Sequence, residues 1–202
     1  ALRYIPAQIR TLEDLHLPPI FGTMTQMKQG LVLVTGPTGH GKSTTLAAMI
    51  QRINQERSEH IVTIEDPVEY VHTPGEMRDY ETIEAALTIA ETGHLVFATL
   101  HTNSAAQTID RIVDVFPEKE QQQIRGQLSL SLEAVIAQRL IPSEDGSRIA
   151  VAEVLLASPA VRSLIRDGKS HMLTNVMQTS TDVGMRTLDM ALVEAYKQGK
   201  IS

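Results

Sequence analysis

The stretch that decides the fold is LVLVTGPTGHGKST, residues 31–44. Its first five residues are apolar or β-branched without interruption, which is typical of a strand buried on both faces. The next eight match the pattern G-x-x-x-x-G-K-[ST] in full, and apolar residues at helical spacing follow over Lys42–Glu56. Strand, glycine-rich loop and helix in this order predict a phosphate-binding loop and a nucleotide-binding domain.

The segments around this loop extend the same pattern. A second apolar run, Ile61–Ile64, makes a strand–helix–strand unit with the first, which indicates a parallel sheet. Periodicity predicts helices over 81–92, 104–115 and 118–140 and strands over 94–100 and 148–156. Ser158 is a suitable N-cap before Pro159, and further helices are predicted over 171–178 and 185–198. We therefore predict an α/β fold with a mainly parallel sheet flanked by helices over residues 1–157, and a C-terminal helical appendage over 158–202.

Composition narrows the class of protein. The chain has 202 residues, 42% of them hydrophobic, which suits one globular domain with a small appendage. It has no cysteine, which excludes disulfides and thiolate metal sites and fits a reducing cytoplasm. A net charge of −6 and an aromatic content of 3% argue against a nucleic-acid partner and against direct binding to anionic lipid. No apolar run is long enough to span a bilayer, and the first residues do not resemble a secretion signal.

The loop itself supplies the candidate nucleotide ligands. Backbone N–H groups of the loop wrap phosphates, Lys42 is expected to reach the β- and γ-phosphates of ATP, and Ser43 is expected to bind Mg²⁺ through its hydroxyl. We assign His40 no side-chain chemistry and expect its ring to face solvent. The predicted cofactor-binding residues are Gly36, Pro37, Thr38, Gly39, His40, Gly41, Lys42, Ser43 and Thr44.

Two acidic clusters compete for the role of catalytic carboxylate. Glu65 and Asp66 follow the apolar run 61–64 directly, as a carboxylate at a strand end does. Glu76 and Asp79 lie in GEMRD, residues 75–79, but the residues before it are too few and too broken for a strand. From the residues alone, both clusters stay open as candidates.

Four segments together resemble one family. GPTGHGKSTT (36–45), IEDPVEY (64–70), GEMRDYETIEAALTIAETGHLVFATLHTNSA (75–105) and IDRIVDVFP (109–117) resemble the type IV pilus retraction ATPases, the PilT family of the secretion ATPase superfamily. AVRSLIRDGK (160–169) is similar to a segment associated with the retraction branch. Extension and type II secretion ATPases usually carry a four-cysteine zinc element, and this chain has no cysteine.

The resemblance implies a RecA-like, Mg²⁺-dependent ATPase and gives roles to particular residues. Glu76 corresponds to the catalytic glutamate that polarises water. Glu65, with Glu69, falls in an acidic box near Mg²⁺ and the phosphates, so Glu65 would bind the metal indirectly. His101, with His94, falls in a histidine box, and His101 would sense the γ-phosphate or couple it to motion.

The resemblance also implies an assembly and a place in the cell. Members of the family form homohexamers that act on an inner-membrane pilus platform protein from its cytoplasmic face and power twitching motility. We expect the same of this chain, with membrane contact only through the protein partner. The resemblance leads us to expect that an N-terminal PAS-like domain of the family is absent from this chain.

The resemblance also explains why no strand precedes GEMRD in this chain. Members of the family carry an additional segment between the positions of Thr73 and Gly75, which includes the strand that leads to the catalytic glutamate. We therefore expect the natural protein to contain an internal segment that this chain lacks. An intact mass near 22.2 kDa for the natural protein would contradict this expectation.

Three other functions remain open at this level. The chain could be a pilus extension or type II secretion motor, an ATP-binding structural subunit without turnover, or a nucleic-acid motor of the same fold. Arg162, Arg166 and Lys169 could contact a partner or form the polar side of an amphipathic helix.

Overall fold

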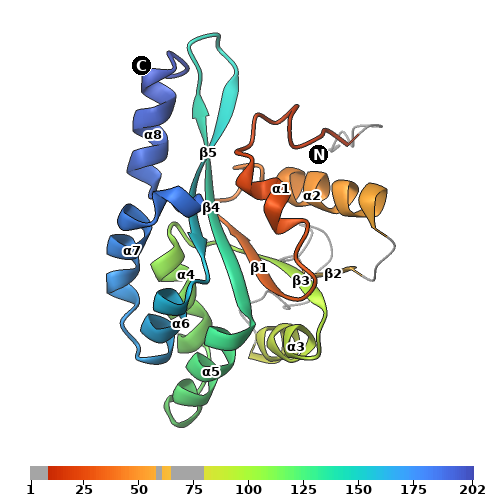
Figure 1. The fold of residues 1–202 in the computed structure, drawn as a ribbon, viewed down its shortest axis with the longest axis vertical. Helices are drawn as coiled ribbons and strands as arrows, with labels where there is room; N and C mark the ends of the chain where they lie inside the picture. The colour runs from red at the N-terminus through yellow and green to blue at the C-terminus, as the bar shows by residue number, and fades with distance from the viewer. Residues whose placement is uncertain (1–8, 58–60, 65–79) are drawn as a thin grey trace.

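The protein is described by a computed structural model that covers residues 9–57, 61–64 and 80–202, with backbone only for 61–64. The described strands form one sheet in the order β2-β3-β1-β4-β5. The strands are β1 (Gly30–Thr35), β2 (Ile61–Ile64), β3 (Leu95–Leu100), β4 (Leu132–Pro142) and β5 (Arg148–Leu156). The first four run parallel and β5 runs antiparallel to β4 (Figure 1). The predicted mainly parallel sheet flanked by helices is confirmed.

Helices cover both faces of this sheet. In chain order they are α1 (Ile20–Met24), α2 (Lys42–Glu56), α3 (Tyr80–Glu91), α4 (Ala105–Asp114), α5 (Glu118–Ser131), α6 (Pro159–Arg166), α7 (Leu173–Thr179) and α8 (Leu188–Lys197). Figure 1 shows α1 and α2 on one side of the sheet and α4, α6 and α7 on the other. None of the helices in the described ranges is long and apolar enough to cross a membrane.

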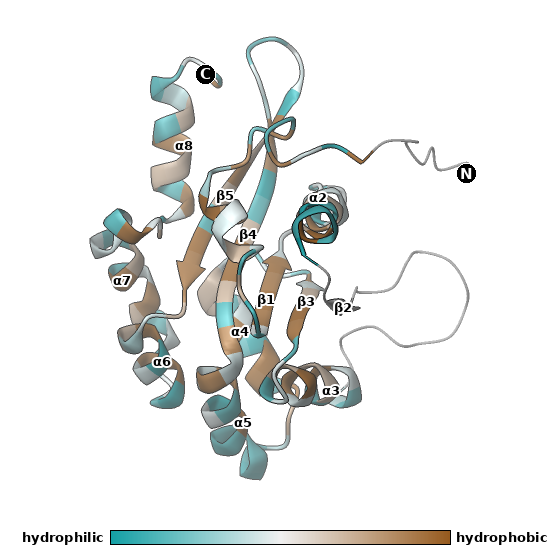
Figure 2. Cartoon of the chain, turned by 45° about the vertical axis from the view of Figure 1, so that its right-hand side comes forward, coloured by the Kyte–Doolittle hydropathy of each residue, from teal (hydrophilic) through white to brown (hydrophobic). Residues whose placement is uncertain are grey.

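The core consists of two layers of apolar side chains, one on each face of the sheet. Because successive strand residues point to opposite faces, Val32 and Val34 pack with α1 and α2, whereas Leu31 and Leu33 pack with α3, α4 and α5. Every residue of β1 and β3 is buried, as predicted from their unbroken apolar runs. Figure 2 shows both strands as hydrophobic.

The predicted long helix over 118–140 is wrong. The helix α5 ends at Ser131, and the next residues form β4, which pairs with β1 on one side and β5 on the other. Val135 and Ile136 fit helical spacing, but they point to opposite faces of the sheet and both are buried. A strand covered on both faces has apolar residues at consecutive positions, so its pattern also fits a buried helix.

A turn between β4 and β5 carried a signal for this strand. Asp145 and Gly146 lie at the tip, Gly146 has a φ of 80°, and Ser143 N donates to Ser147 O at 2.9 Å. Asp-Gly between two apolar runs is a strong hairpin signal because glycine adopts positive φ without steric cost. The turn therefore requires a strand before residue 143 as well as after residue 147.

The residues after Ala157 are helical and pack on the sheet. Ser158 caps α6, with its Oγ accepting from Val161 N at 3.4 Å and Pro159 in the first turn, as predicted. Apolar side chains from α6, α7 and the segment before α8 join the same buried cluster as Val96 and Val135. Arg186, two residues before α8, exchanges two backbone hydrogen bonds with Val154 of β5.

Candidate nucleotide-binding site

The glycine-rich loop connects β1 to α2 and contains three glycines with positive φ. Gly36, Gly39 and Gly41 have φ values of 140°, 78° and 82°, which residues with a β-carbon rarely adopt. At Gly36 a β-carbon would lie 2.2 Å from the carbonyl oxygen of Gln138. The loop can therefore follow this path only because glycine occupies these positions.

The side chain of Gln138, on β4, holds the loop in place through hydrogen bonds. This side chain is 1% exposed, its Oε1 accepts from Thr45 Oγ1 at 2.7 Å, and its Nε2 donates to His40 O at 2.8 Å. One amide thus links the strand to the loop and to the first turns of α2. A helix over 118–140 gives Gln138 no role at the loop, whereas the hairpin signal at Asp145-Gly146 places residue 138 on a strand.

The ring of His40 does not face solvent freely, which corrects the expectation. His40 Nδ1 accepts a hydrogen bond from the backbone N–H of Leu140 at 3.0 Å. Because a backbone N–H can only donate, Nδ1 carries no proton in this arrangement. The His40 side chain is therefore a second structural link between the loop and β4.

Lys42 turns its ammonium group back into the loop. Its side chain is buried, and Nζ donates to Gly36 O at 2.8 Å and to Pro37 O at 3.2 Å. Nζ also lies 3.2 Å from Nδ1 of His101. The ammonium is a donor only, so His101 Nδ1 accepts, and the ring proton is on Nε2.

His101 reaches the loop from the end of β3. Its Nδ1 also lies 3.4 Å from Thr38 Oγ1, so the ring contacts both the loop and its lysine. The other predicted member of the box, His94, is exposed at the opposite end of β3. The structure thus brings His101 to the site and leaves His94 away from it.

The remaining predicted ligands divide into two groups. Ser43 and Thr44 are exposed in the first turn of α2, beside the loop. Glu65 and Glu76, with Asp66, Glu69 and Asp79, lie outside the described residues.

Within the described ranges no group of three or more His, Cys, Asp or Glu residues could hold a metal ion. The exposed hydroxyl of Ser43 beside the phosphate loop is a suitable ligand for Mg²⁺. This ion usually binds few protein groups, and phosphate and water oxygens complete its coordination.

A cavity of about 600 Å³ opens beside the loop, and Gly41, Thr44 and Thr45 form part of its wall. This volume is in the range of small-molecule sites. Three cationic and two acidic side chains line it: Arg10, Arg148, Lys200, Asp14 and Asp145. Hydrogen bonds from the backbone and hydroxyl of Thr11 lower the pKa of Asp14, and those from Ser147 lower the pKa of Asp145. Both acids are therefore ionised at neutral pH.

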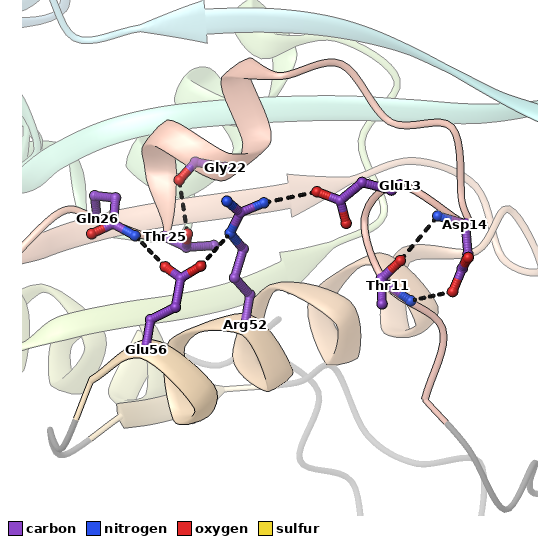
Figure 3. A network of polar contacts seen from close by, with 8 residues as sticks. All are labelled: Thr11, Glu13, Asp14, Gly22, Thr25, Gln26, Arg52 and Glu56. Atoms are coloured by element: carbon purple, nitrogen blue, oxygen red, sulfur yellow. Dashed lines mark hydrogen bonds and ion pairs between the residues drawn. The ribbon is translucent and has the colours of Figure 1, made fainter.

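The chain before β1 forms one wall of this cavity and is tied to α2 (Figure 3). Arg52 of α2 donates to Glu13 at 3.0 Å and to Glu56 at 3.1 Å, and Gln26 donates to Glu56. Thr11 and Asp14 close a small turn through two hydrogen bonds of 3.1 Å. Exposed pairs of this kind add little stability, and the pair of Glu13 with Arg52 connects this segment to α2, the helix that follows the phosphate loop.

Of the basic residues in segment 160–169, Arg162 has a structural position. Its guanidinium donates to Ser129 O and Leu130 O, both at 2.9 Å, and to Glu133 at 2.8 Å. It therefore binds the last turn of α5 and the start of β4. Arg166 and Lys169 are exposed.

Comparison with known proteins points to one family. The sequence profile described as "Type II/IV secretion system protein" matches residues 18–74 and 71–147. A twitching motility protein of Neisseria gonorrhoeae is 47% identical over 99% of this chain and 63% of its own length. A type IV pilus retraction ATPase, PilT, of Pseudomonas aeruginosa is 45% identical over 99% of this chain and 68% of its own.

Solved structures agree with the sequence comparison. A crystal structure of the pilus retraction motor PilT with bound ADP matches with a TM-score of 0.87 and 43% identity, covering 99% of this chain and 66% of that one. The chain thus spans about two thirds of the length of the relatives it matches. The alignment with the Neisseria protein has 235 positions against 202 residues here, so at least 33 positions (235 − 202) have no counterpart in this chain.

Proposed function

We propose that this chain, which belongs to the family of type II/IV secretion system proteins, is the ATP-hydrolysing core of a type IV pilus retraction motor. The observation that carries the proposal is the contact of Lys42 Nζ with His101 Nδ1 at 3.2 Å inside a complete phosphate loop. This contact joins the two motifs expected to meet at a γ-phosphate. The identity of 45–47% to retraction and twitching proteins over 99% of the chain supports the retraction branch.

The described residues have distinct parts in binding ATP. Loop residues 36–44 present backbone N–H groups at the start of α2, where the helix dipole favours phosphate. Lys42 exchanges its carbonyl partners for phosphate oxygens when nucleotide enters the loop. Ser43 would hold Mg²⁺ through its hydroxyl, and the metal would supply positive charge against the phosphates. The cavity of about 600 Å³ beside Thr44 and Thr45 accepts the nucleoside.

Hydrolysis requires groups that lie outside the described residues. We assign Glu76 to orient and polarise the attacking water, and Glu65 would bind Mg²⁺ indirectly. His101 senses the γ-phosphate, since its ring already contacts Lys42 and Thr38 at the loop. The family resemblance and the position of His101 support these roles.

An internal segment belongs between Thr73 and Gly75 in the natural protein. Two observations support this: the family profile matches in two parts that meet at residues 71–74, and the alignment has at least 33 positions (235 − 202) without a counterpart here. The intact mass of the natural protein tests the proposal. A mass above that of this chain by the mass of such a segment is expected, and the mass of this chain alone would contradict it.

The assembly is proposed to be a homohexamer on the cytoplasmic face of the inner membrane, where it acts on the pilus platform protein and binds no nucleic acid. We propose a core over 1–157 and a helical subdomain over 158–202, preceded in the natural protein by a PAS-like domain. Likeness to a pilus retraction motor supports this assignment. Light scattering of the purified protein with nucleotide should give six times the subunit mass.

Steady-state hydrolysis by the full-length protein tests the enzyme assignment. We expect Mg²⁺-dependent ATP turnover that is lost in Lys42→Ala and in Glu76→Ala, while both variants keep a cooperative thermal unfolding transition. Lys28→Ala and Glu84→Ala are matched controls, because both residues are exposed and lie away from the loop. Normal turnover in Glu76→Ala would refute the role of Glu76.

The same experiment tests the alternative that the protein is a structural subunit, which would bind ATP without hydrolysing it. A structural subunit would bind a fluorescent ATP analogue and show equally negligible turnover with and without Glu76. An extension motor would hydrolyse ATP as a retraction motor does. A deletion strain distinguishes these two, because loss of a retraction motor leaves cells piliated without twitching, whereas loss of an extension motor leaves them without pili.

A further inference from the structure

The short turn over residues 11–17, before β1, ends in a Schellman motif. The N–H of His16 donates to Glu13 O at 2.9 Å, and the N–H of Leu17 donates to Leu12 O at 3.1 Å. These are the two hydrogen bonds that define the motif, and its two leucines belong to the same buried cluster, as the residues at these positions commonly do. His16 therefore occupies the C′ position, where the backbone is left-handed.

Histidine is an unusual residue at this position. Within the described ranges it is the one residue other than glycine that has a positive φ, 52°. A β-carbon is strained in this conformation and glycine is not, which is why glycine is the usual residue at C′. The turn by itself is therefore better served by glycine. A side chain held on a strained backbone points to a role for that side chain.

The His16 side chain borders the nucleotide site. It is exposed and lines the cavity of about 600 Å³ that Gly41 and Thr44 also line. Apolar residues contribute to the same lining, among them Leu140 and Ile149. Leu140 lies directly beside the end of the phosphate loop, because a β-carbon at Gly41 would be 3.6 Å from its Cδ1. A flat imidazole ring and aliphatic side chains around one space beside a phosphate loop suit an aromatic heterocycle.

The turn that carries His16 has one defined conformation before any ligand binds. Thr11 and Asp14 close its start with two reciprocal hydrogen bonds of 3.1 Å, as in a capping box (Figure 3). Glu13 accepts from Arg52 of α2 at 3.0 Å, which connects the turn to the helix that follows the loop. Little backbone entropy is therefore lost when a ligand contacts the ring, and such preorganisation favours binding.

We propose that His16 is a specificity-determining residue that stacks on the base of the bound nucleotide and favours a purine. With the phosphates in the loop and the nucleoside in the cavity, the base lies against the imidazole ring. A base of two fused rings shares more area with this ring than a base of one ring, so a purine is bound more tightly than a pyrimidine. The inference rests on the proposed function, because it takes the cavity to hold the nucleoside.

Three variants separate the ring from the turn that carries it. His16→Gly removes the ring and relieves the backbone strain, so it should raise the thermal unfolding midpoint and weaken ADP binding about tenfold. His16→Phe keeps a flat aromatic ring and should bind ADP within about twofold of wild type. His94→Ala is the matched control, because it removes an exposed histidine at the opposite end of β3, and it should leave ADP binding unchanged.

Isothermal titration calorimetry of the full-length protein measures the stacking contribution with ADP, CDP and pyrophosphate as ligands. Wild type and His16→Phe should bind ADP at least about fivefold more tightly than CDP, and His16→Gly should lose most of this preference. Pyrophosphate, which has no nucleoside, should bind equally to wild type and all three variants. A residue with a structural role alone would not give higher stability together with a loss of affinity confined to the nucleoside.

The outcomes separate this inference from the proposed function. If wild type binds neither ADP nor pyrophosphate, the proposed function is contradicted and the inference falls with it. If wild type binds both but does not distinguish ADP from CDP, or if His16→Gly binds ADP as wild type does, only the stacking role is overturned. Equal losses of ADP and pyrophosphate affinity in His16→Gly also overturn it, because they would report a change in the phosphate loop.

A fourth variant keeps the test decisive if His16→Gly shows no cooperative unfolding transition. His16→Asn then replaces it, because asparagine is the other residue commonly found at C′ and has no aromatic ring. It should bind ADP about tenfold more weakly than wild type and pyrophosphate equally well. Unchanged ADP affinity in His16→Asn would overturn the inference.

Discussion

Single atoms at Gly36 and Gln138 determine whether the phosphate loop can form. A β-carbon at position 36 would lie 2.2 Å from Gln138 O, whereas one at Gly39 would meet nothing within 4 Å. Both glycines have positive φ, so alanine is strained at either position. Only at Gly36 does the strain combine with a clash against backbone that β4 holds in place.

Gly36→Ala and Gly39→Ala therefore form a matched pair. We expect Gly39→Ala to lower the free energy of unfolding by about 1 kcal/mol from backbone strain alone, and Gly36→Ala to lower it by more than about 3 kcal/mol. Gly36→Ala should also abolish binding of a fluorescent ATP analogue. Chemical denaturation and fluorescence titration measure the two effects, and equal losses in both variants would show that the clash is relieved without cost.

Gln138 gives a second test at this scale. Gln138→Leu leaves the Thr45 hydroxyl and the His40 carbonyl without their partner, which should cost about 2–3 kcal/mol and weaken nucleotide binding. Thr45→Val removes only the first of these bonds and should cost about 1 kcal/mol. If Gln138→Leu cost no more than Thr45→Val in urea unfolding, the link to His40 would not support the loop.

The junction between α5, β4 and α6 shows how one side chain joins three elements. Arg162 of α6 donates to the carbonyls of Ser129 and Leu130 at the end of α5 and to Glu133 at the start of β4. A helix leaves its last carbonyls without intrahelical partners, and a cation there also complements the helix dipole. The helix-to-strand change at residue 132 is therefore stabilised by a residue 30 positions later.

Arg162→Ala should consequently destabilise the protein by about 1.5–3 kcal/mol, because hydrogen bonds to a charged group are lost and Glu133 is left half-buried without its ion pair. Arg166→Ala, an exposed residue of the same helix, should change stability by less than about 0.5 kcal/mol. Thermal unfolding midpoints compare the two variants. Equal midpoints would contradict the role of Arg162 and return segment 160–169 to consideration as a partner-binding surface.

The stability of the whole molecule reports the cost of burying Glu153. Burial raises the pKa of Glu153 above its ordinary 4.5 in the folded chain, and the unfolded chain keeps the ordinary value. The folded state then binds the proton more tightly, so Glu153 contributes stability that is fully present below pH 4.5 and is lost as pH rises through the folded pKa. Arg139 and Asp189 face the same carboxylate and act in opposite directions.

Glu153→Gln does not titrate, and it isolates this effect. We expect the unfolding midpoint of wild type, relative to Glu153→Gln, to decrease as pH is raised from 4.5 to 7.5, since all other groups titrate alike in the two proteins. Differential scanning calorimetry across this range provides the measurement. A difference that stays constant with pH would mean that burial does not perturb Glu153.

Local patterns in the sequence determined the phosphate loop and the strands β1 and β3. A full G-x-x-x-x-G-K-[ST] match and unbroken apolar runs depend on neighbours in sequence, so they can be recognised without the fold. The histidine came from resemblance to a family whose motifs cover this chain, and the fold then placed its ring 3.2 Å from Lys42.

Only the tertiary structure decided the conformation of residues 132–142 and the residues that depend on it. Apolar positions 135 and 136 fit a helix or a strand equally, and the choice is made by β1 and β5, which supply backbone partners on both sides. Gln138 became a support of the loop, and Glu153 an acceptor for the first N–H group of α4, because strand pairing and helix packing join residues that lie between 48 and 98 positions apart. Such contacts leave no local pattern, because each partner alone is an ordinary polar residue whose role is set by what the fold places beside it.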